Sequence, residues 1–150
     1  MDEAIKGIKK ILSSVHQMVL CTSNKNKPWT ATVIFANDED LNLYFFSSKE
    51  RRHSQEIEKN KFVAGSIAAE HKKGLNERVH RGLQFEGVCK LVDESEAEKM
   101  YENFKKRHKN IVKFHDKKSA TKELYKIKVK VFVLFDSSKK KMRQEVKWQN

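Results

Sequence analysis

Apolar residues recur at helical spacing near the beginning of the chain. Isoleucine, leucine and valine side chains stand three or four positions apart, at Ile5, Ile8, Ile11, Leu12 and Val15. Side chains with this spacing share one face of an α-helix. Asp2 precedes them and can cap the first backbone N–H groups. The pattern predicts an amphipathic helix over residues 3–16.

Short apolar segments, separated by polar turns, follow this helix. They predict strands over residues 18–23, 29–36, 41–47, 61–69, 81–92 and 124–135. The Asn/Asp-rich turn between the second and third of these segments indicates a β-hairpin. Gly82 and Gly87 interrupt the fifth, as glycines do at a β-bulge or a barrel corner.

The segment at residues 124–135 has the clearest alternation in the chain. One face is expected to carry Tyr125, Ile127, Val129, Val131 and Val133. The other face carries lysines, at Lys126, Lys128 and Lys130. Strict alternation predicts a strand with one buried and one exposed face. The segment that follows it is polar as far as Trp148.

Two more helices are expected, over residues 53–60 and 94–108. Asp93 and Glu96 form a possible capping box at the start of the second. Its apolar face carries Ala97, Met100, Tyr101 and Phe104. At least six strands with helices between them favour a small closed or partly open barrel with peripheral helices. A mixed α+β sandwich is the alternative. With one proline and no repeat, residues 1–150 are expected to form one domain.

The net charge of +12 is unevenly distributed along the chain. Residues 1–98 carry 15 basic and 15 acidic residues, whereas residues 99–150 carry 17 and 5. A basic C-terminal third can attract nucleic acid or other anions, so a nucleic-acid-binding module is one alternative function. A solvated lysine-rich surface is the other explanation.

Hydropathy and cysteine content indicate a cytoplasmic protein. Apolar runs are far shorter than the roughly 18 residues of a membrane helix. The first ten residues are too polar for a signal peptide. Cys21 and Cys89 lie within apolar segments without a CxxC motif, which is typical of buried reduced thiols. The six histidines form no HExxH motif, so no metal site is predicted.

One segment carries candidate chemistry, YFFSSKERRHSQEIEKN at residues 44–60. Here a strand leads directly into a helix, so free N–H groups and the positive end of the helix dipole point to one place. Hydroxyl, guanidinium and imidazole groups surround that place, from Ser47, Ser48, Arg51, Arg52 and His53. Arginine can bind two phosphate oxygens at once. This segment predicts a phosphomonoester site, with an ordinary solvated turn as the alternative.

The order of elements resembles the pyridoxamine 5′-phosphate oxidase-like family of FMN-binding split barrels. The resemblance covers roughly residues 15–92, with weaker support to residue 136. MVLCTSNKNKPWTATVIFANDEDLNLYFF follows the first three strands of the family. Ser47 then takes the place of a hydroxyl residue, and the Arg51–His53 cluster opens the helix. GLQFEGVCKLV is similar to the family's central strand, with Gln84 at a position that reaches the flavin.

The resemblance implies a mainly β fold with peripheral helices, a six-stranded antiparallel split β-barrel. It also implies a homodimer with FMN at the subunit interface, acting as a flavin-dependent oxidoreductase on a small molecule. The implied phosphate ligands are Ser47, Arg52 and His53, with Ser48 and Arg51 beside them. Backbone groups of Thr32, Val33 and Ile34 would line the isoalloxazine ring, and Gln84 would reach it from another strand.

Two departures separate the chain from the oxidase itself. Thr30-Ala31-Thr32 stands where the oxidase has a phosphate-binding arginine, and the tail, ending VKWQN, lacks the oxidase's substrate motif apart from Trp148. The chain therefore resembles the small members of the family more than the oxidase. Some split barrels bind haem, which makes a haem-binding relative a further alternative.

Overall fold

The computed structural model describes residues 2–69, 79–110 and 123–148. Its elements are α1 (Glu3–Ser14), β1 (Gln17–Asn24), β2 (Lys27–Ile34), β3 (Ala36–Asn37), β4 (Leu43–Phe46), α2 (Arg52–Lys59), β5 (Phe62–Ala68), β6 (Arg81–Leu91), α3 (Glu94–Arg107), β7 (Leu124–Asp136) and β8 (Arg143–Lys147). The three predicted helices are confirmed, with ends shifted by one or two residues. The described sheet has eight strands rather than six, because Phe35 divides the second predicted strand and the polar tail forms β8.

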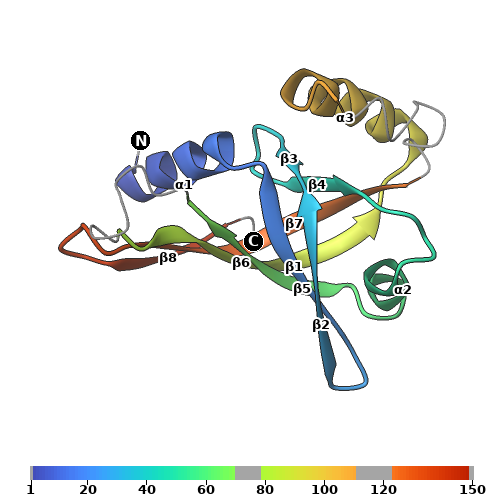
Figure 1. The fold of residues 1–150 in the computed structure, drawn as a ribbon, viewed down its shortest axis with the longest axis horizontal. Helices are drawn as coiled ribbons and strands as arrows, with labels where there is room; N and C mark the ends of the chain where they lie inside the picture. The colour runs from blue at the N-terminus through green and yellow to red at the C-terminus, as the bar shows by residue number, and fades with distance from the viewer. Residues whose placement is uncertain (1, 70–78, 111–122, 149–150) are drawn as a thin grey trace.

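The strands form one curled antiparallel sheet (Figure 1). Their order is β2-β1-β5-β6-β7-β4-β3, with β8 added to β7. Phe35 alone separates β2 from β3, so the two ends of this order are joined through the chain itself. The sheet therefore curls into a split barrel, as predicted. The predicted hairpin between the second and third segments is reduced to two residue pairs, Ala36–Tyr44 and Asn37–Leu43.

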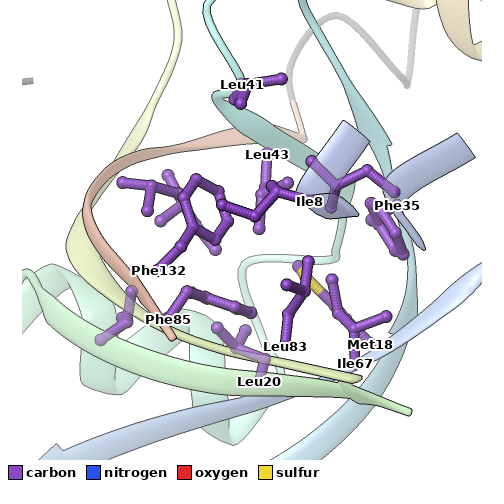
Figure 2. Close-up of a cluster of buried hydrophobic side chains, with 14 of the residues drawn as sticks. Ile8, Met18, Leu20, Phe35, Leu41, Leu43, Ile67, Leu83, Phe85 and Phe132 are labelled. Carbon is purple, nitrogen blue, oxygen red and sulfur yellow. The ribbon is translucent and has the colours of Figure 1, made fainter. Parts of the chain in front are cut away.

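The interior of the barrel is filled by aliphatic and aromatic side chains (Figure 2). The largest fully buried ones include Phe35, Phe45, Phe132, Met18 and Leu20. Helix α1 adds its apolar face to this core through Ala4, Ile8, Ile11 and Leu12. Burial of this apolar surface is the main stabilising contribution to the fold. None of the helices in the described residues combines the length and the apolar character needed to cross a bilayer.

Strand β7 departs from the predicted alternation halfway along its length. Val129 is buried as expected, but Phe132 and Leu134 point into the core where Val131 and Val133 were predicted. The pairing with β6 shifts register between Glu86 and Gly87, which inserts one extra residue into β7. A one-residue insertion moves every later side chain to the opposite face. The bulge expected at Gly87 is confirmed, and it overturns the predicted burial of Val131 and Val133.

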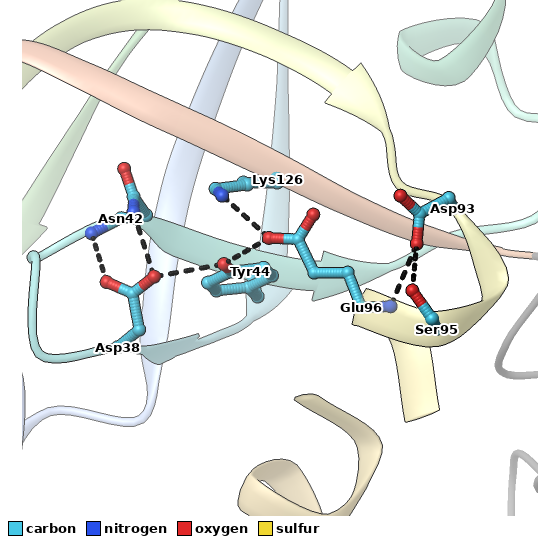
Figure 3. Close-up of polar contacts among 7 residues, drawn as sticks. All are labelled: Asp38, Asn42, Tyr44, Asp93, Ser95, Glu96 and Lys126. Carbon is cyan, nitrogen blue, oxygen red and sulfur yellow. Dashed lines mark hydrogen bonds and ion pairs between the residues drawn. The ribbon is translucent and has the colours of Figure 1, made fainter. Parts of the chain in front are cut away.

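Helix α3 is fastened to the sheet by a polar cluster (Figure 3). Its predicted N-cap is confirmed, since Asp93 accepts a hydrogen bond from the Glu96 N–H at 2.9 Å. The Glu96 side chain contacts the sheet instead of completing the capping box. Its Oε1 lies 3.0 Å from the Tyr44 hydroxyl and 2.6 Å from Lys126 Nζ. The same hydroxyl lies 3.0 Å from Asp38 Oδ2. Burial and these two carboxylates raise the pKa of Tyr44.

Substitution Tyr44→Phe is expected to lower the free energy of unfolding by about 2 kcal/mol, because hydrogen bonds to charged groups contribute roughly 1.5–3 kcal/mol. Urea unfolding followed by circular dichroism measures the loss. The matched variant is Glu96→Gln, which weakens the same contact from the other side. The double variant should lose less than the sum of the two single variants. Additive losses would mean that the Tyr44–Glu96 contact does not hold α3 on the sheet.

Candidate functional site

A pocket of about 700 Å³ lies between β2 and the beginning of α2. We call it the α2 pocket. It is lined by Trp29, Thr30, Ala31, Thr32, Val33, Ile34, Phe46, Ser47, Ser48, Arg51, Arg52, His53, Phe104 and Glu123. Strand β4 ends at Phe46, so the chain crosses this pocket between leaving the sheet and entering the helix. The predicted strand-to-helix segment therefore forms one wall, and β2 forms another.

The N-terminus of α2 differs from those of the other two helices. Asp2 caps α1 and Asp93 caps α3, and both helices have acidic residues in the first turn. The N-cap of α2 is Arg51, whose side chain makes no capping hydrogen bond, and its first turn has no acidic residue. The first N–H groups of a helix need partners, and the positive dipole end favours an anion. At α2 no acidic residue of the helix's own first turn offsets the positive dipole end, and Arg51 to His53, where the helix begins, line the pocket.

Arg52 is held in place by its neighbours. Its guanidinium lies over the Trp29 ring, 4.1 Å from the centroid, and its Nε donates to Glu56 Oε2 at 3.0 Å. Glu56 in turn accepts a hydrogen bond from Thr22 Oγ1 at 2.7 Å. The Thr22 hydrogen bond and the Arg52 charge lower the pKa of Glu56. The described residues offer the two terminal amino groups of Arg52 no acceptor. They can therefore bind two oxygens of an anion, as a guanidinium does with phosphate.

Ser47 belongs to a buried hydrogen-bond network behind this wall. Its Oγ lies 2.6 Å from His53 Nε2 and accepts from Ser54 Oγ at 3.1 Å. When His53 Nε2 carries the proton, Ser47 accepts from both neighbours and its own hydroxyl proton can point to the pocket. Burial, followed by the nearby Arg51 charge, lowers the pKa of His53. A neutral His53 in the Nε2–H tautomer therefore positions Ser47 as a hydrogen-bond donor.

Acidification is expected to destabilise the chain through His53. Its folded-state pKa lies below the ordinary value of about 6.5, so between these two values the unfolded chain binds more protons. Stability is therefore lost as the pH falls from about 6.5 towards the folded-state pKa. The variant His53→Gln should lose less stability over that interval. Urea unfolding at about pH 7.5 and pH 5.5 tests this, and an equal loss in both proteins would contradict it.

Strand β2 offers backbone groups to the same pocket. Within the described residues it pairs with β1 alone, from Gln17–Ile34 to Asn24–Lys27. Every second residue of such an edge strand turns its N–H and C=O away from its neighbour. The pocket lies along Trp29–Ile34, so these groups are available to a planar ligand that needs both donors and acceptors.

Eight of the nine residues predicted for the site line the α2 pocket, and the ninth does not. Gln84 lies on β6, is exposed, and accepts from Arg143 Nη2 of β8 at 3.0 Å. Sequence reasoning missed the support of Arg52 by Glu56 and, through Glu56, by Thr22, which lies 34 residues away from Glu56. The spacing Arg52–Glu56, one helical turn, was the only signal available. Phe104 and Glu123 were also missed as pocket residues.

The arrangement favours binding of an anion beside a planar group over acid–base chemistry. The two cysteines are free, and burial raises the pKa of Cys21 and of Cys89. Thiols of this kind are poor nucleophiles. In the part of the chain that the structure describes, no three His, Cys, Asp or Glu side chains gather as metal ligands.

Comparison with known proteins gives matches over most of the chain. A family model described as pyridoxamine 5′-phosphate oxidase matches residues 4–134. A UPF0306 protein from Cronobacter sakazakii is 31% identical over 106 residues, which cover 70% of this chain and 72% of that protein. A candidate pyridoxamine 5′-phosphate oxidase from Listeria innocua is 26% identical, with a TM-score of 0.67 over 88% of this chain and 98% of its own.

More distant structures share the fold alone. A FAD-binding protein from Mesorhizobium loti has a TM-score of 0.67 at 15% identity, covering 88% of this chain and 92% of its own. A haem storage protein from Vibrio cholerae has a TM-score of 0.65 at 16% identity, covering 80% and 85%. The fold thus has both flavin-binding and haem-binding relatives.

Proposed function

Because the chain belongs to the pyridoxamine 5′-phosphate oxidase family, we propose that it binds FMN in the α2 pocket, at the interface of a homodimer. The uncapped beginning of α2, together with the two arginines beside it, is the observation that carries the proposal. We further propose that the protein is a flavin-dependent oxidoreductase that acts on a small molecule.

The phosphate of FMN fits the α2 end of the pocket. The terminal amino groups of Arg52 would each bind an oxygen, with the cation of Arg51 beside them. Ser47 and Ser48 would donate from the end of β4, and the first N–H groups of α2 would complete the site. In this arrangement His53 positions Ser47 and is not itself a phosphate ligand. That differs from the direct role implied by the family resemblance.

The isoalloxazine ring fits the β2 side of the pocket. Its carbonyl and N–H groups need hydrogen-bond partners along one edge, and the free edge of Thr32, Val33 and Ile34 offers both kinds. Trp29 and Ile34, 43% and 44% exposed, supply apolar surface there. FMN, when bound, supplies the electron or hydride transfer, while the protein supplies position and electrostatics.

One observation supports a homodimer, and the role that the family resemblance implies for Gln84 adds a second argument. Large apolar side chains at the pocket are half exposed in a single chain, and a second copy would remove them from water. Gln84 lies outside the α2 pocket of its own chain, so its predicted contact with the flavin requires the second copy. The exposed position of Gln84 on β6 is compatible with that contact.

Flavin titration combined with sedimentation tests both proposals. FMN added to the purified protein should lose its fluorescence with one flavin bound per chain, and the complex should sediment as a dimer. Stoichiometric flavin on a monomer would support the cofactor and contradict the interface. A dimer that leaves FMN fluorescence unchanged would contradict the cofactor.

A further inference from the structure

A second cavity, larger than the α2 pocket, lies between α1 and the β7–β8 hairpin. It has a volume of about 960 Å³. We call it the α1–β8 cavity. It is lined by Glu3, Lys6, Gly7, Lys10, Ile11, Ser14, Ala69, Val79, Arg81, Leu134, Asp136, Lys139, Lys140, Lys141, Met142 and Gln144. Figure 1 shows α1 and α2 towards opposite ends of the molecule, so this cavity is separate from the α2 pocket.

The α1–β8 cavity has an excess of positive charge on two opposing walls. Both of its acidic residues are already paired: Glu3 with Lys6 at 3.2 Å, and Asp136 with Arg81 at 3.0 Å. Lys10 on α1 and the three lysines at residues 139–141 of the hairpin have no ion-pair partner among the described residues. Four unpaired cations that face one hollow favour an anionic ligand.

The floor between these walls is aliphatic. It contains Ile11 and Leu134, which are 3% and 9% exposed, and Met142, which is 57% exposed. Gly7 lets α1 approach this floor closely, since a Cβ atom there would stand 2.8 Å from Leu134 Cδ2. No aromatic ring is among the described residues that line the cavity. Nucleic-acid bases are usually held by aromatic stacking, so this floor suits a hydrocarbon chain better than a base.

We propose that the α1–β8 cavity binds a long-chain aliphatic anion. Its carboxylate or phosphate group lies among the lysines at residues 139–141 and Lys10, and its hydrocarbon chain lies along Ile11, Leu134 and Met142. Lysine is a point charge that does not require a forked partner, so either headgroup is accepted. Burial of each methylene group of the ligand adds to the affinity. This site is independent of flavin binding in the α2 pocket.

Titration of the full chain with dodecanoate, below its micelle concentration, tests the proposal. Protein labelled with ¹³C at the methionine methyl groups gives a local readout. The Met142 resonance should shift with saturation, while those of Met18 and Met100, which are buried elsewhere, should stay in place. Calorimetry should show one site per chain for dodecanoate and for dodecyl phosphate. Dodecanol and inorganic phosphate should each bind at least tenfold more weakly, because dodecanol lacks the charged headgroup and inorganic phosphate lacks the hydrocarbon chain.

Charge variants separate a built site from general attraction to a basic protein. Lys139→Gln/Lys140→Gln/Lys141→Gln should weaken dodecanoate binding about tenfold, since three exposed ion pairs that contribute about twofold each multiply to roughly that factor. The control Lys105→Gln/Lys106→Gln/Lys128→Gln removes the same charge from exposed positions outside the cavity and should leave the affinity unchanged. Equal losses in both triple variants would overturn the proposal, as would an unchanged Met142 resonance.

Two further measurements identify the source of the anion and exclude a competing ligand. Flotation with phosphatidylglycerol vesicles tests whether the ligand is a membrane lipid. If it is, the protein floats with the vesicles. If the ligand is a free anion, the protein binds dodecanoate but does not float. Either result supports the cavity when dodecanoate competes. A single-stranded oligonucleotide that shifts Met142 and displaces dodecanoate would overturn the proposal in favour of nucleic acid.

Discussion

The double variant Arg51→Gln/Arg52→Gln is expected to bind FMN about 100-fold more weakly than the natural sequence. Its affinity for riboflavin, which lacks the phosphate, should change little. Charge-assisted hydrogen bonds contribute roughly 1.5–3 kcal/mol each, and about 3 kcal/mol corresponds to a factor of about 100. Fluorescence titration with both flavins measures the difference.

The control for this variant removes two positive charges without touching the α2 pocket. Lys59→Gln/Lys61→Gln acts at the far end of α2, where both side chains are exposed. It should retain FMN affinity at moderate ionic strength, because exposed charges at that distance are largely screened. If the arginine variant loses riboflavin and FMN equally, then Arg51 and Arg52 support the ring or the fold and do not bind the phosphate.

Substitution Arg107→Ala is expected to lower the free energy of unfolding by about 3 kcal/mol, because hydrogen bonds from a charged group contribute roughly 1.5–3 kcal/mol each and several are lost together. Arg107 ends α3 and reaches two other parts of the chain. It donates through Nη2 to the carbonyls of Leu12 and Val15, at the end of α1, with 2.6 Å to Val15 O. It also donates through Nη1 to Asn37 Oδ1 at 3.0 Å.

The chemistry of the α1 C-terminus explains the size of this effect. The last turn of α1 contains no basic residue, so the guanidinium of Arg107 supplies the positive charge that the dipole favours there. It also lies 5.0 Å from the Phe35 ring centroid, where β2 passes into β3. Arg107 is partly buried, and this burial lowers the pKa of its guanidinium. Truncation would leave the carbonyl oxygens of Leu12 and Val15 without this donor.

Two variants make the Arg107 prediction specific. Lys106→Ala removes a charge from the exposed neighbouring position and should change stability by no more than about 0.5 kcal/mol. Arg107→Lys keeps the charge without the fork and should recover only part of the loss. Urea midpoints followed by circular dichroism compare the three. Equal stability of the Arg107→Ala and Lys106→Ala variants would contradict the network described for Arg107.

Local periodicity predicted the helices and most strands because it depends on neighbours in the sequence. The Asp2 and Asp93 caps were visible for the same reason. The face reversal in β7 was not visible, because it depends on the register against β6 near Gly87. Strand β8 has a polar sequence that is stable as a strand only because β7 provides a partner.

In the candidate site, too, features formed by sequence neighbours could be predicted and contacts between distant residues could not. Ser47 to His53 are contiguous, so their shared position at the start of a helix could be read from the chain. The Arg52–Trp29 stacking and the Glu56–Thr22 hydrogen bond join distant residues and needed the fold. The pocket residue His53 has its Nε2 bonded to Ser47, which does not favour the haem alternative at this pocket.

A crystal structure of the protein grown with FMN is the most direct test of the flavin proposal. The account predicts the phosphorus atom at the beginning of α2, with its oxygens within hydrogen-bond distance of Ser47 Oγ and the Arg52 guanidinium, and the ring along β2. An FMN phosphate among the lysines at residues 139–141, with the α2 pocket empty, would contradict it.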